Sequence, residues 1–263
     1  MRPLWLTLVL LALASAPAAP FFSERLEAAE GAPEAALRIG AAADLRYALP
    51  EAIAAFPKAG KDVRIEATYA SSGKLYAEAL QGADWDLILA ADREYPERLI
   101  LAGAARGPVF VYAHGSVVLW AKRESPIWKA GDALAALRSS ALRRLALANP
   151  RVAPYGRAAE EGLRRARLLP ALASKLVFGE NVVQAFQFAQ QGAADACLIS
   201  RSLALAPPAQ KEGRFAELPA EAFSVLEQGG VILQRCRHPE WAEAFRDFLV
   251  GPEGQKLFRS HGL

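Results

Sequence analysis

The sequence predicts an α/β fold of two lobes, each a mostly parallel sheet flanked by helices, with a hinge between the lobes. Short apolar runs typical of buried strands alternate with segments whose apolar residues recur at helical spacing. Such alternation indicates repeated strand–helix–strand units. The 263 residues are enough for two lobes with separate cores. Loops that lead from a strand into a helix occur twice in each half.

The first half contains three predicted strand–helix pairs. Residues Leu37–Ala43 are typical of a buried strand that ends in small side chains. Asp44 follows as a good N-cap for a helix that continues to Phe56. The other elements of this half are strands at 63–69 and 86–90 and helices at 73–80 and 96–102. This half therefore predicts one sheet with its covering helices.

The second half begins in a long strand-like run, residues 109–121, which His114-Gly115-Ser116 interrupts. Residues 203–218 are polar and proline-rich and predict a surface segment. The other predicted elements are helices at 133–137, 158–169, 182–191, 239–249 and 252–258, and strands at 145–148, 175–178, 197–199 and 230–234. We predict one lobe from residues 37–115 plus 226–263 and the other from 116–225. Strands around Val117–Leu119 and Val231–Leu233 would connect them.

The N-terminus has the pattern of a cleavable secretory signal. Arg2 precedes the apolar run Leu4–Leu13, and small residues follow that run. The run is too short for a comfortable membrane span. Residues 1–30 are therefore predicted to be a signal peptide and linker, with cleavage between Ala16 and Glu30. The mature protein is predicted to be periplasmic or otherwise exported.

Composition excludes several classes of function. The hydrophobic fraction of 53% and the charged fraction of 22% indicate a globular protein, and the net charge of +3 gives no support for nucleic-acid binding. Cys197 and Cys236 lie in or after apolar runs, so buried free thiols and a disulfide both remain open. The three histidines lack metal-ligand spacing, so no metal site is predicted.

Four loops indicate a binding site for an anion. They are Ala41–Asp44, Ser71–Gly73, Ala153–Gly156 and Asn181–Val183. In open α/β sheets, ligands bind outside the carboxyl ends of the strands. A helix that begins there presents backbone N–H groups and the positive end of its dipole, which together attract an anion. A fully ionised oxyanion has only acceptors, so a site made of donors selects it.

The chain resembles the periplasmic molybdate-binding proteins of ABC importers over roughly Leu37 to Leu263. The order and spacing of several short motifs carry the resemblance. They are Ala41-Ala42-Ala43-Asp44-Leu45, Tyr69-Ala70-Ser71-Ser72-Gly73-Lys74-Leu75-Tyr76, Asp86-Leu87-Ile88-Leu89-Ala90-Ala91-Asp92, Ala148-Asn149-Pro150 with Ala153-Pro154-Tyr155-Gly156, Asn181-Val182-Val183-Gln184-Ala185-Phe186, and Leu249-Val250-Gly251-Pro252. The resemblance implies two hinged lobes around a molybdate or tungstate ion, a membrane permease as partner, a monomeric state and no cofactor.

The resemblance also implies the site residues. Ser72, or its neighbour Ser71, would supply a hydroxyl, and Tyr155 and Val182 would supply backbone amides. Family members often have serine, or threonine-asparagine, at the positions of Ala43 and Asp44. Some members use a tyrosine hydroxyl at the position of Ser200. The predicted ligand-binding residues are Ala43, Asp44, Ser71, Ser72, Tyr155, Val182 and Ser200. An ionised Asp44 would repel a dianion, unless it is protonated, turned aside or capping its helix.

Other functions remain open from the residues alone. A receptor for sulfate or phosphate would use a similar site, whereas an organic acid would call for an arginine clamp, and Arg151 and Arg157 only flank the loops. A secreted hydrolase would need a nucleophile with a base, but the sequence has no Gly-x-Ser-x-Gly elbow. A nucleotide-binding P-loop is excluded because Thr68 occupies the position of its first glycine.

Overall fold

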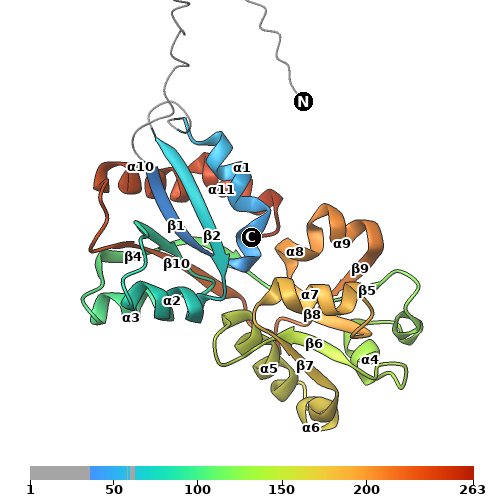
Figure 1. The fold of residues 1–263 in the computed structure, drawn as a ribbon. Coiled ribbons are helices and arrows are strands. Elements are labelled where there is room, and N and C mark those ends of the chain that lie inside the picture. The colour runs from blue at the N-terminus through green and yellow to red at the C-terminus, as the bar shows by residue number, and fades with distance from the viewer. Residues whose placement is uncertain (1–35, 58, 60–62) are drawn as a thin grey trace, which may run out of the picture. The chain divides into compact units, whose positions relative to one another are not determined.

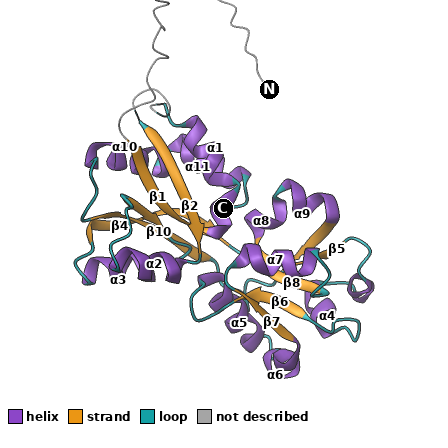
Figure 2. Cartoon of the chain, in the orientation of Figure 1, coloured by secondary structure: helices purple, strands orange, loops and turns teal. Residues whose placement is uncertain are grey.

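The structure is a computed structural model that describes residues 36–57, 59 and 63–263. The predicted signal peptide and linker lie outside the described residues. Within the part that is described, no helix is both long enough and apolar enough to cross a membrane. The described chain forms two five-stranded sheets, each flanked by helices (Figures 1 and 2), which confirms the predicted two-lobed α/β fold.

The first sheet has the strand order β2-β1-β3-β10-β4. Its strands are β1 (Ala36–Ala42), β2 (Arg64–Ala70), β3 (Leu87–Leu89), β4 (Ala105–Gly115) and β10 (Leu226–Leu233). The pairs β1–β2 and β1–β3 are parallel, whereas β10 runs antiparallel to both β3 and β4. Its helical elements are the 3₁₀ turn η1 (Ala43–Arg46) and the helices α1 (Ala48–Ala55), α2 (Ser72–Leu80), α3 (Glu94–Leu101), α10 (Pro239–Val250) and α11 (Pro252–Ser260).

The second sheet has the order β7-β6-β8-β5-β9. Its strands are β5 (Val117–Lys122), β6 (Leu145–Ala148), β7 (Leu176–Gly179), β8 (Ala196–Ser200) and β9 (Gly213–Glu217). The pairs β6–β7 and β6–β8 are parallel, and β5 is antiparallel to β8 and β9. Its helical elements are η2 (Pro126–Ala130), α4 (Ala133–Arg138), α5 (Pro154–Arg165), α6 (Leu169–Leu172), η3 (Ala173–Lys175), α7 (Val182–Gln190), α8 (Arg201–Leu205) and α9 (Pro207–Glu212).

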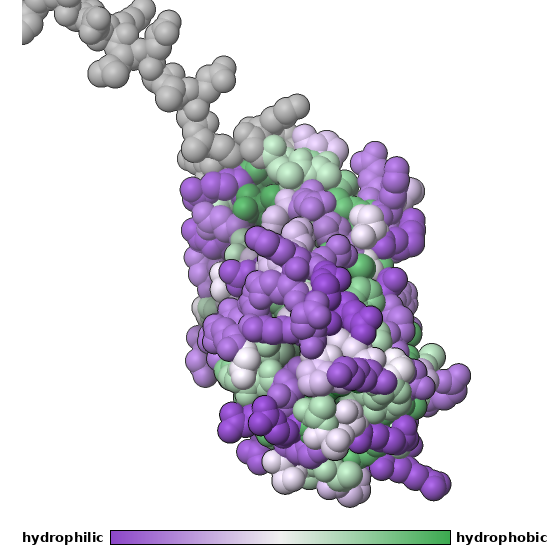
Figure 3. Space-filling view, turned by 90° about the vertical axis from the view of Figure 1, so that its right-hand side faces the viewer, coloured by the Kyte–Doolittle hydropathy of each residue, from purple (hydrophilic) through white to green (hydrophobic). Residues whose placement is uncertain are grey.

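The central strand β3 of the first sheet is buried on both faces and is an apolar run without alternation, whereas the edge strand β2 alternates polar and apolar residues. Leu87 and Leu89 pack with Phe245 and other residues of α1, α10 and α11. Ile88, which points the other way from the same strand, packs with residues of α2 and α3 such as Leu75. The helices on each side of the sheet are visible in Figure 1. Large exposed apolar side chains are scattered along the described chain, and hydrophilic side chains dominate the face in Figure 3.

The chain passes from the first sheet to the second at Ser116, between β4 and β5, and returns through residues 218–225, between β9 and β10. The break predicted at residues 114–116 is therefore a crossing between sheets. Residues Val117–Leu119 and Val231–Leu233 were both predicted to connect the lobes. The first segment pairs with β8 and β9 inside the second sheet, and the second segment pairs with β3 and β4 inside the first sheet. The return crossing lies several residues earlier than expected.

Residues 203–218 contain more regular structure than expected. The segment that the sequence predicts to lie at the surface forms α8, α9 and β9. Strand β9 is the edge of the second sheet and pairs with β5. These elements are short, and α9 begins with two consecutive prolines, so the segment shows no hydrophobic periodicity. Pro207 is the first helical residue of α9, a position that proline favours.

Candidate functional site

A small cavity lies at the carboxyl ends of strands from both sheets. Elements that contribute to it follow β1, β2, β3, β6 and β7. All four loops predicted from the sequence meet here. The lining residues are Ala42, Ala43, Asp44, Ala70, Ser71, Ser72, Ala91, Ala153, Pro154, Tyr155, Asn181 and Val182. The structure thus brings together six of the seven predicted site residues, all except Ser200.

Backbone N–H groups at two helix starts of the second lobe line the cavity. Helix α5 begins at Pro154, which has no N–H, so Tyr155 is the first residue of this helix with a donor. At the start of α7, the Asn181 side chain accepts from the N–H groups of Val183 and Gln184, at 3.0 and 3.2 Å. The Val182 N–H stays outside this cap and has no intrahelical acceptor. Tyr155 and Val182, whose amides the resemblance implies, therefore both lie at helix starts beside the cavity.

The two serines of the first lobe differ in what their hydroxyl groups already bind. Ser72 Oγ accepts from the Ala91 N–H at 3.0 Å, so its proton remains available for donation. Ser71 Oγ is buried and has no hydrogen-bond partner among the described residues. A buried hydroxyl without a partner is costly unless something else binds it. Ser71, the second choice from sequence, is therefore the more conspicuous candidate contact.

Asp44 does not cap a helix, contrary to one of the sequence-based possibilities. The N-cap of η1 is Ala42, and no side chain caps this turn. The Asp44 carboxylate instead accepts from Gln228 Nε2 at 2.7 Å, and the same nitrogen lies 2.9 Å from the Tyr155 hydroxyl. Burial raises the pKa of Asp44 to about 6, although hydrogen bonds from Gln228 and Tyr155 oppose this shift.

Gln228 is a site residue that the sequence analysis missed. It is fully buried in β10 beside a β-bulge, where Gln228 pairs with Ala113 and the next residue, Gly229, pairs with Val111. The bulge redirects the strand next to the cavity. Gly115, just before the crossing, makes room for this group, because a Cβ there would clash with the Tyr155 hydroxyl and lie 2.7 Å from Gln228 Nε2. No local sequence pattern marks Gln228.

Ser200 does not line the cavity. It is fully buried at the start of α8, where its Oγ accepts from the Leu203 N–H at 3.2 Å. Ser202 Oγ lies 3.0 Å from Ser200 Oγ and 3.2 Å from the backbone oxygen of Asp44. Ser200 therefore caps a helix, and its neighbour Ser202 connects this helix with the loop after β1.

Contacts between the two lobes surround the cavity. The Gly73 N–H donates to the Val152 carbonyl at 2.8 Å, which joins the start of α2 to the loop before α5. Lys74 and Glu180 form an exposed ion pair at 3.4 Å. These bonds hold the loops of the two lobes together around the cavity.

Arg157 of α5 makes a further charged contact between the lobes. Its guanidinium makes a short ion pair with Asp92 and a second with Glu94 at 3.3 Å, and it lies 5.3 Å from the centre of the Tyr95 ring. Burial raises the pKa of Asp92 to about 6, while the Tyr95 N–H and Arg157 oppose the shift. Because Asp92 is 16% exposed and Arg157 35% exposed, solvent screens this pair only in part.

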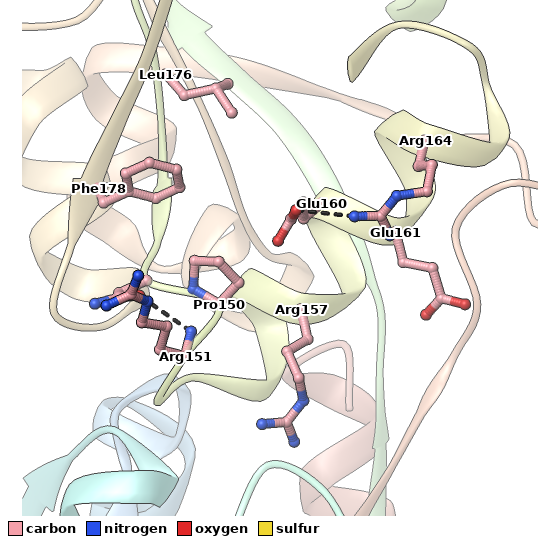
Figure 4. A pocket seen from close by; sticks show the side chains of 9 residues that line it. Pro150, Arg151, Arg157, Glu160, Glu161, Arg164, Leu176 and Phe178 are labelled. Carbon is pink, nitrogen blue, oxygen red and sulfur yellow. Dashed lines mark hydrogen bonds and ion pairs between the residues drawn. The ribbon is translucent and has the colours of Figure 1, made fainter. Parts of the chain in front are cut away.

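A larger, open hollow of about 1330 Å³ of empty space lies on the second lobe (Figure 4). It is lined by Arg151, Arg157 and Arg164 together with carboxylates and the apolar Leu176 and Phe178. Arg164 already pairs with Glu160 of the same helix at 2.9 Å. We favour the small cavity as the candidate site, because residues of both lobes line it and the unpartnered Ser71 hydroxyl lies there.

The comparison with known proteins decides the family. The family of bacterial extracellular solute-binding proteins matches residues 37–263 of this chain. The chain belongs to this family. This solute-binding protein is 31% identical to the molybdate-binding protein ModA of Azotobacter vinelandii over 200 residues, which cover 76% of the chain and 78% of the relative. It is 32% identical to ModA of Rhodobacter capsulatus over 199 residues, 74% of the chain and 76% of the relative.

Solved structures agree with this assignment. The Azotobacter vinelandii periplasmic molybdate-binding protein superposes on the solute-binding protein with a TM-score of 0.78 and 28% identity, covering 86% of this chain and 97% of the other. The sulfate-binding protein SubI of Mycobacterium tuberculosis reaches a TM-score of 0.76 at 17% identity, covering 87% and 86% of the two chains. At that identity the likeness to SubI concerns the fold alone.

Proposed function

We propose that this solute-binding protein is an extracytoplasmic receptor that binds molybdate and delivers it to the permease of an ABC transporter. Two relatives above 30% identity are molybdate-binding proteins. The observation that carries the proposal is the buried Ser71 hydroxyl without a partner, at a cavity that Tyr155 and Val182 from two helix starts of the other lobe also line. Ser72 and Ala43 complete the proposed site, and tungstate is a second proposed ligand. We propose no enzymatic activity and no cofactor.

The chemistry of the lining favours a fully ionised oxyanion. No lysine, arginine or histidine is among the described residues that line the cavity. A dianion there would be held by N–H and O–H dipoles, each charge-assisted bond contributing roughly 1.5–3 kcal/mol. Several such bonds are needed to offset the loss of the water around the ion. Donors without counter-charge suit an anion that has four acceptor oxygens and no proton to donate.

We also propose how the lobes act. One lobe is residues 37–115 plus 226–263 and the other is 116–225, with a signal peptide within residues 1–30 and a monomeric mature protein. The division is supported by the strands, because all members of each sheet fall within one of these sets. A ligand that binds donors of both lobes favours the closed arrangement, and the permease would recognise that arrangement.

Calorimetry with molybdate, tungstate, sulfate and phosphate tests the proposal. We expect molybdate and tungstate to bind with Kd below about 1 μM, which corresponds to roughly −8 kcal/mol. Sulfate and phosphate should bind at least about 100-fold more weakly, a difference of roughly 3 kcal/mol. Equally weak binding of all four anions would contradict the selective-receptor function. Turnover of an ester or phosphoester that is lost in Ser72→Ala would support the hydrolase alternative instead.

Replacing Arg157 with Gln should weaken molybdate binding modestly. The variant loses the ion pairs with Asp92 and Glu94 between the lobes, and partly exposed pairs contribute about 0.5–1 kcal/mol each. We expect a three- to tenfold rise in Kd at low ionic strength, and a smaller one at about 0.5 M salt because salt screens the pairs. Arg164→Gln is the matched control, since Arg164 pairs with Glu160 on the same helix. An equal effect of both variants would count against a contact between lobes.

A further inference from the structure

Asp44 is the one acidic side chain among the described residues that line the cavity. The residue is 2% exposed. Its Oδ2 accepts from Gln228 Nε2 at 2.7 Å, whereas its Oδ1 is buried and has no hydrogen-bond partner among the described residues. A buried polar atom without a hydrogen-bond partner destabilises the protein unless a ligand or a proton binds to it.

An ionised Asp44 conflicts with the proposed ligand. A carboxylate and a dianion in one water-poor cavity repel each other strongly, because little solvent separates them. The groups that act on the Asp44 carboxylate are Gln228 from β10, Tyr155 from α5 and the backbone N–H of Asp44 itself, and none of these is a cation. One proton removes the conflict, and it also converts Oδ1 from an acceptor into a donor.

We propose that Asp44 carries a proton on Oδ1 when the cavity holds molybdate, so that each anion is bound together with one proton taken from solvent. This inference rests on the proposed function. Gln228 determines which oxygen receives the proton, because Oδ2 already accepts from the Gln228 amide. The protonated Asp44 then adds an O–H donor to the hydroxyl and amide donors of the other loops. Asp44 thus contributes a hydrogen-bond donor to the site only in its protonated form.

The surroundings of Asp44 favour the protonated form. Burial raises its pKa to about 6 before any anion is present, and a nearby dianion raises the pKa further. Tyr112 of β4 and Tyr155 also face this group, and burial raises the pKa of both phenols, so they remain neutral. The charge of Asp92 also raises the pKa of Tyr112, and Asp92 itself pairs with Arg157. The Ser202 hydroxyl of α8 contacts the Asp44 backbone oxygen and carries no charge.

The sign of the pH dependence follows from these shifts. The pKa of Asp44 is higher in the complex than in the free protein, so binding takes up protons at any pH between the two values. Below the pKa of the free protein, about 6, Asp44 is already protonated and the affinity is independent of pH. Above it, the affinity falls about tenfold per pH unit until the pKa of the complex is reached.

Calorimetry of molybdate binding in buffers of different ionisation enthalpy measures this proton directly. At about pH 8 we expect the wild type to take up close to one proton per molybdate. Asp44→Asn should take up none, bind with an affinity that does not change between about pH 6 and pH 8.5, and bind more tightly than the wild type at the upper end. Asp92→Asn is the matched control, because the pKa of Asp92 is also raised to about 6 and Asp92 does not line the cavity. This control should keep the proton uptake.

A second measurement needs no variant. Infrared difference spectra of the wild type should show a protonated carboxylic-acid band that appears when molybdate is added at about pH 8. Molybdate binding without proton uptake and without this band would overturn the role of Asp44 while leaving the receptor function intact. Proton uptake that persists in Asp44→Asn would overturn it as well. No molybdate binding at any pH would instead contradict the proposed function.

Discussion

Gly73→Ala is expected to weaken molybdate binding by roughly 30- to 100-fold while both lobes remain folded. The Gly73 N–H donates to the Val152 carbonyl across the cleft, and a Cβ at position 73 would lie 2.7 Å from that oxygen and 2.9 Å from Val152 Cα. These are backbone atoms that cannot rotate away. The contact with Val152 lies between the lobes, so opening the cleft relieves it, and the closed form loses roughly 2–3 kcal/mol. The new Cβ would also lie 2.7 Å from the Tyr95 hydroxyl of the first lobe, so that side chain must shift in the open form too.

The same substitution should affect the stability of the protein in the absence of ligand much less than it affects binding. Gly73 is the second residue of α2, and alanine favours a helix over glycine by up to about 1 kcal/mol, which offsets the cost of moving the Tyr95 hydroxyl. The expected signature is therefore a thermal midpoint close to that of the wild type together with a much higher Kd. Small-angle scattering should show that molybdate compacts the wild type but not Gly73→Ala.

Ala77→Ser is the control for changes in the helix itself, because Ala77 is exposed on the same helix. It should bind molybdate as the wild type does. If Gly73→Ala also bound normally and became compact with ligand, the close approach of Gly73 and Val152 could not be a requirement of the closed form.

Residues that favour helix starts and ends explain which parts of this site could be predicted from the sequence. The start of α7 is determined within three residues by Asn181, and its end by Gly192, which has a φ of +81°. The prolines at 239 and 252 likewise start α10 and α11 as expected. Because the loops that follow parallel strands meet at one edge of a sheet, these local features also predicted which loops converge.

Contacts between distant segments explain what the sequence did not predict. Gln228 hydrogen-bonds Asp44 over a separation of 184 residues, and no periodicity records such a pair. Aspartate is a residue type that is favoured at helix N-caps, but the N-cap of η1 is Ala42. The Asp44 carboxylate accepts a hydrogen bond from Gln228 instead. Ser200 follows a strand just as Ser71 does, yet its hydroxyl is consumed by the Leu203 N–H. Residue type alone cannot distinguish a free hydroxyl from one that caps a helix.

The two adjacent serines provide the test that separates binding from stability. Ser71→Ala removes a buried hydroxyl without a partner, so the free energy of unfolding should stay within about 0.5 kcal/mol of the wild type. If Ser71 donates to molybdate, the same change should raise Kd by about 10- to 100-fold, which corresponds to roughly 1.5–3 kcal/mol.

Ser72→Ala should behave differently, because it leaves the buried Ala91 N–H without its acceptor. We expect it to lower the free energy of unfolding by about 1–3 kcal/mol and also to raise Kd. Denaturant unfolding without ligand and calorimetry with molybdate measure the two quantities separately. A Ser71→Ala variant that binds molybdate normally would show that the unfilled hydroxyl is not a ligand contact, and Ser72 would then be the only hydroxyl that the first lobe offers at the cavity. A stability loss in Ser71→Ala equal to that in Ser72→Ala would mean that Ser71 has a structural partner after all, since only a satisfied hydroxyl is costly to remove.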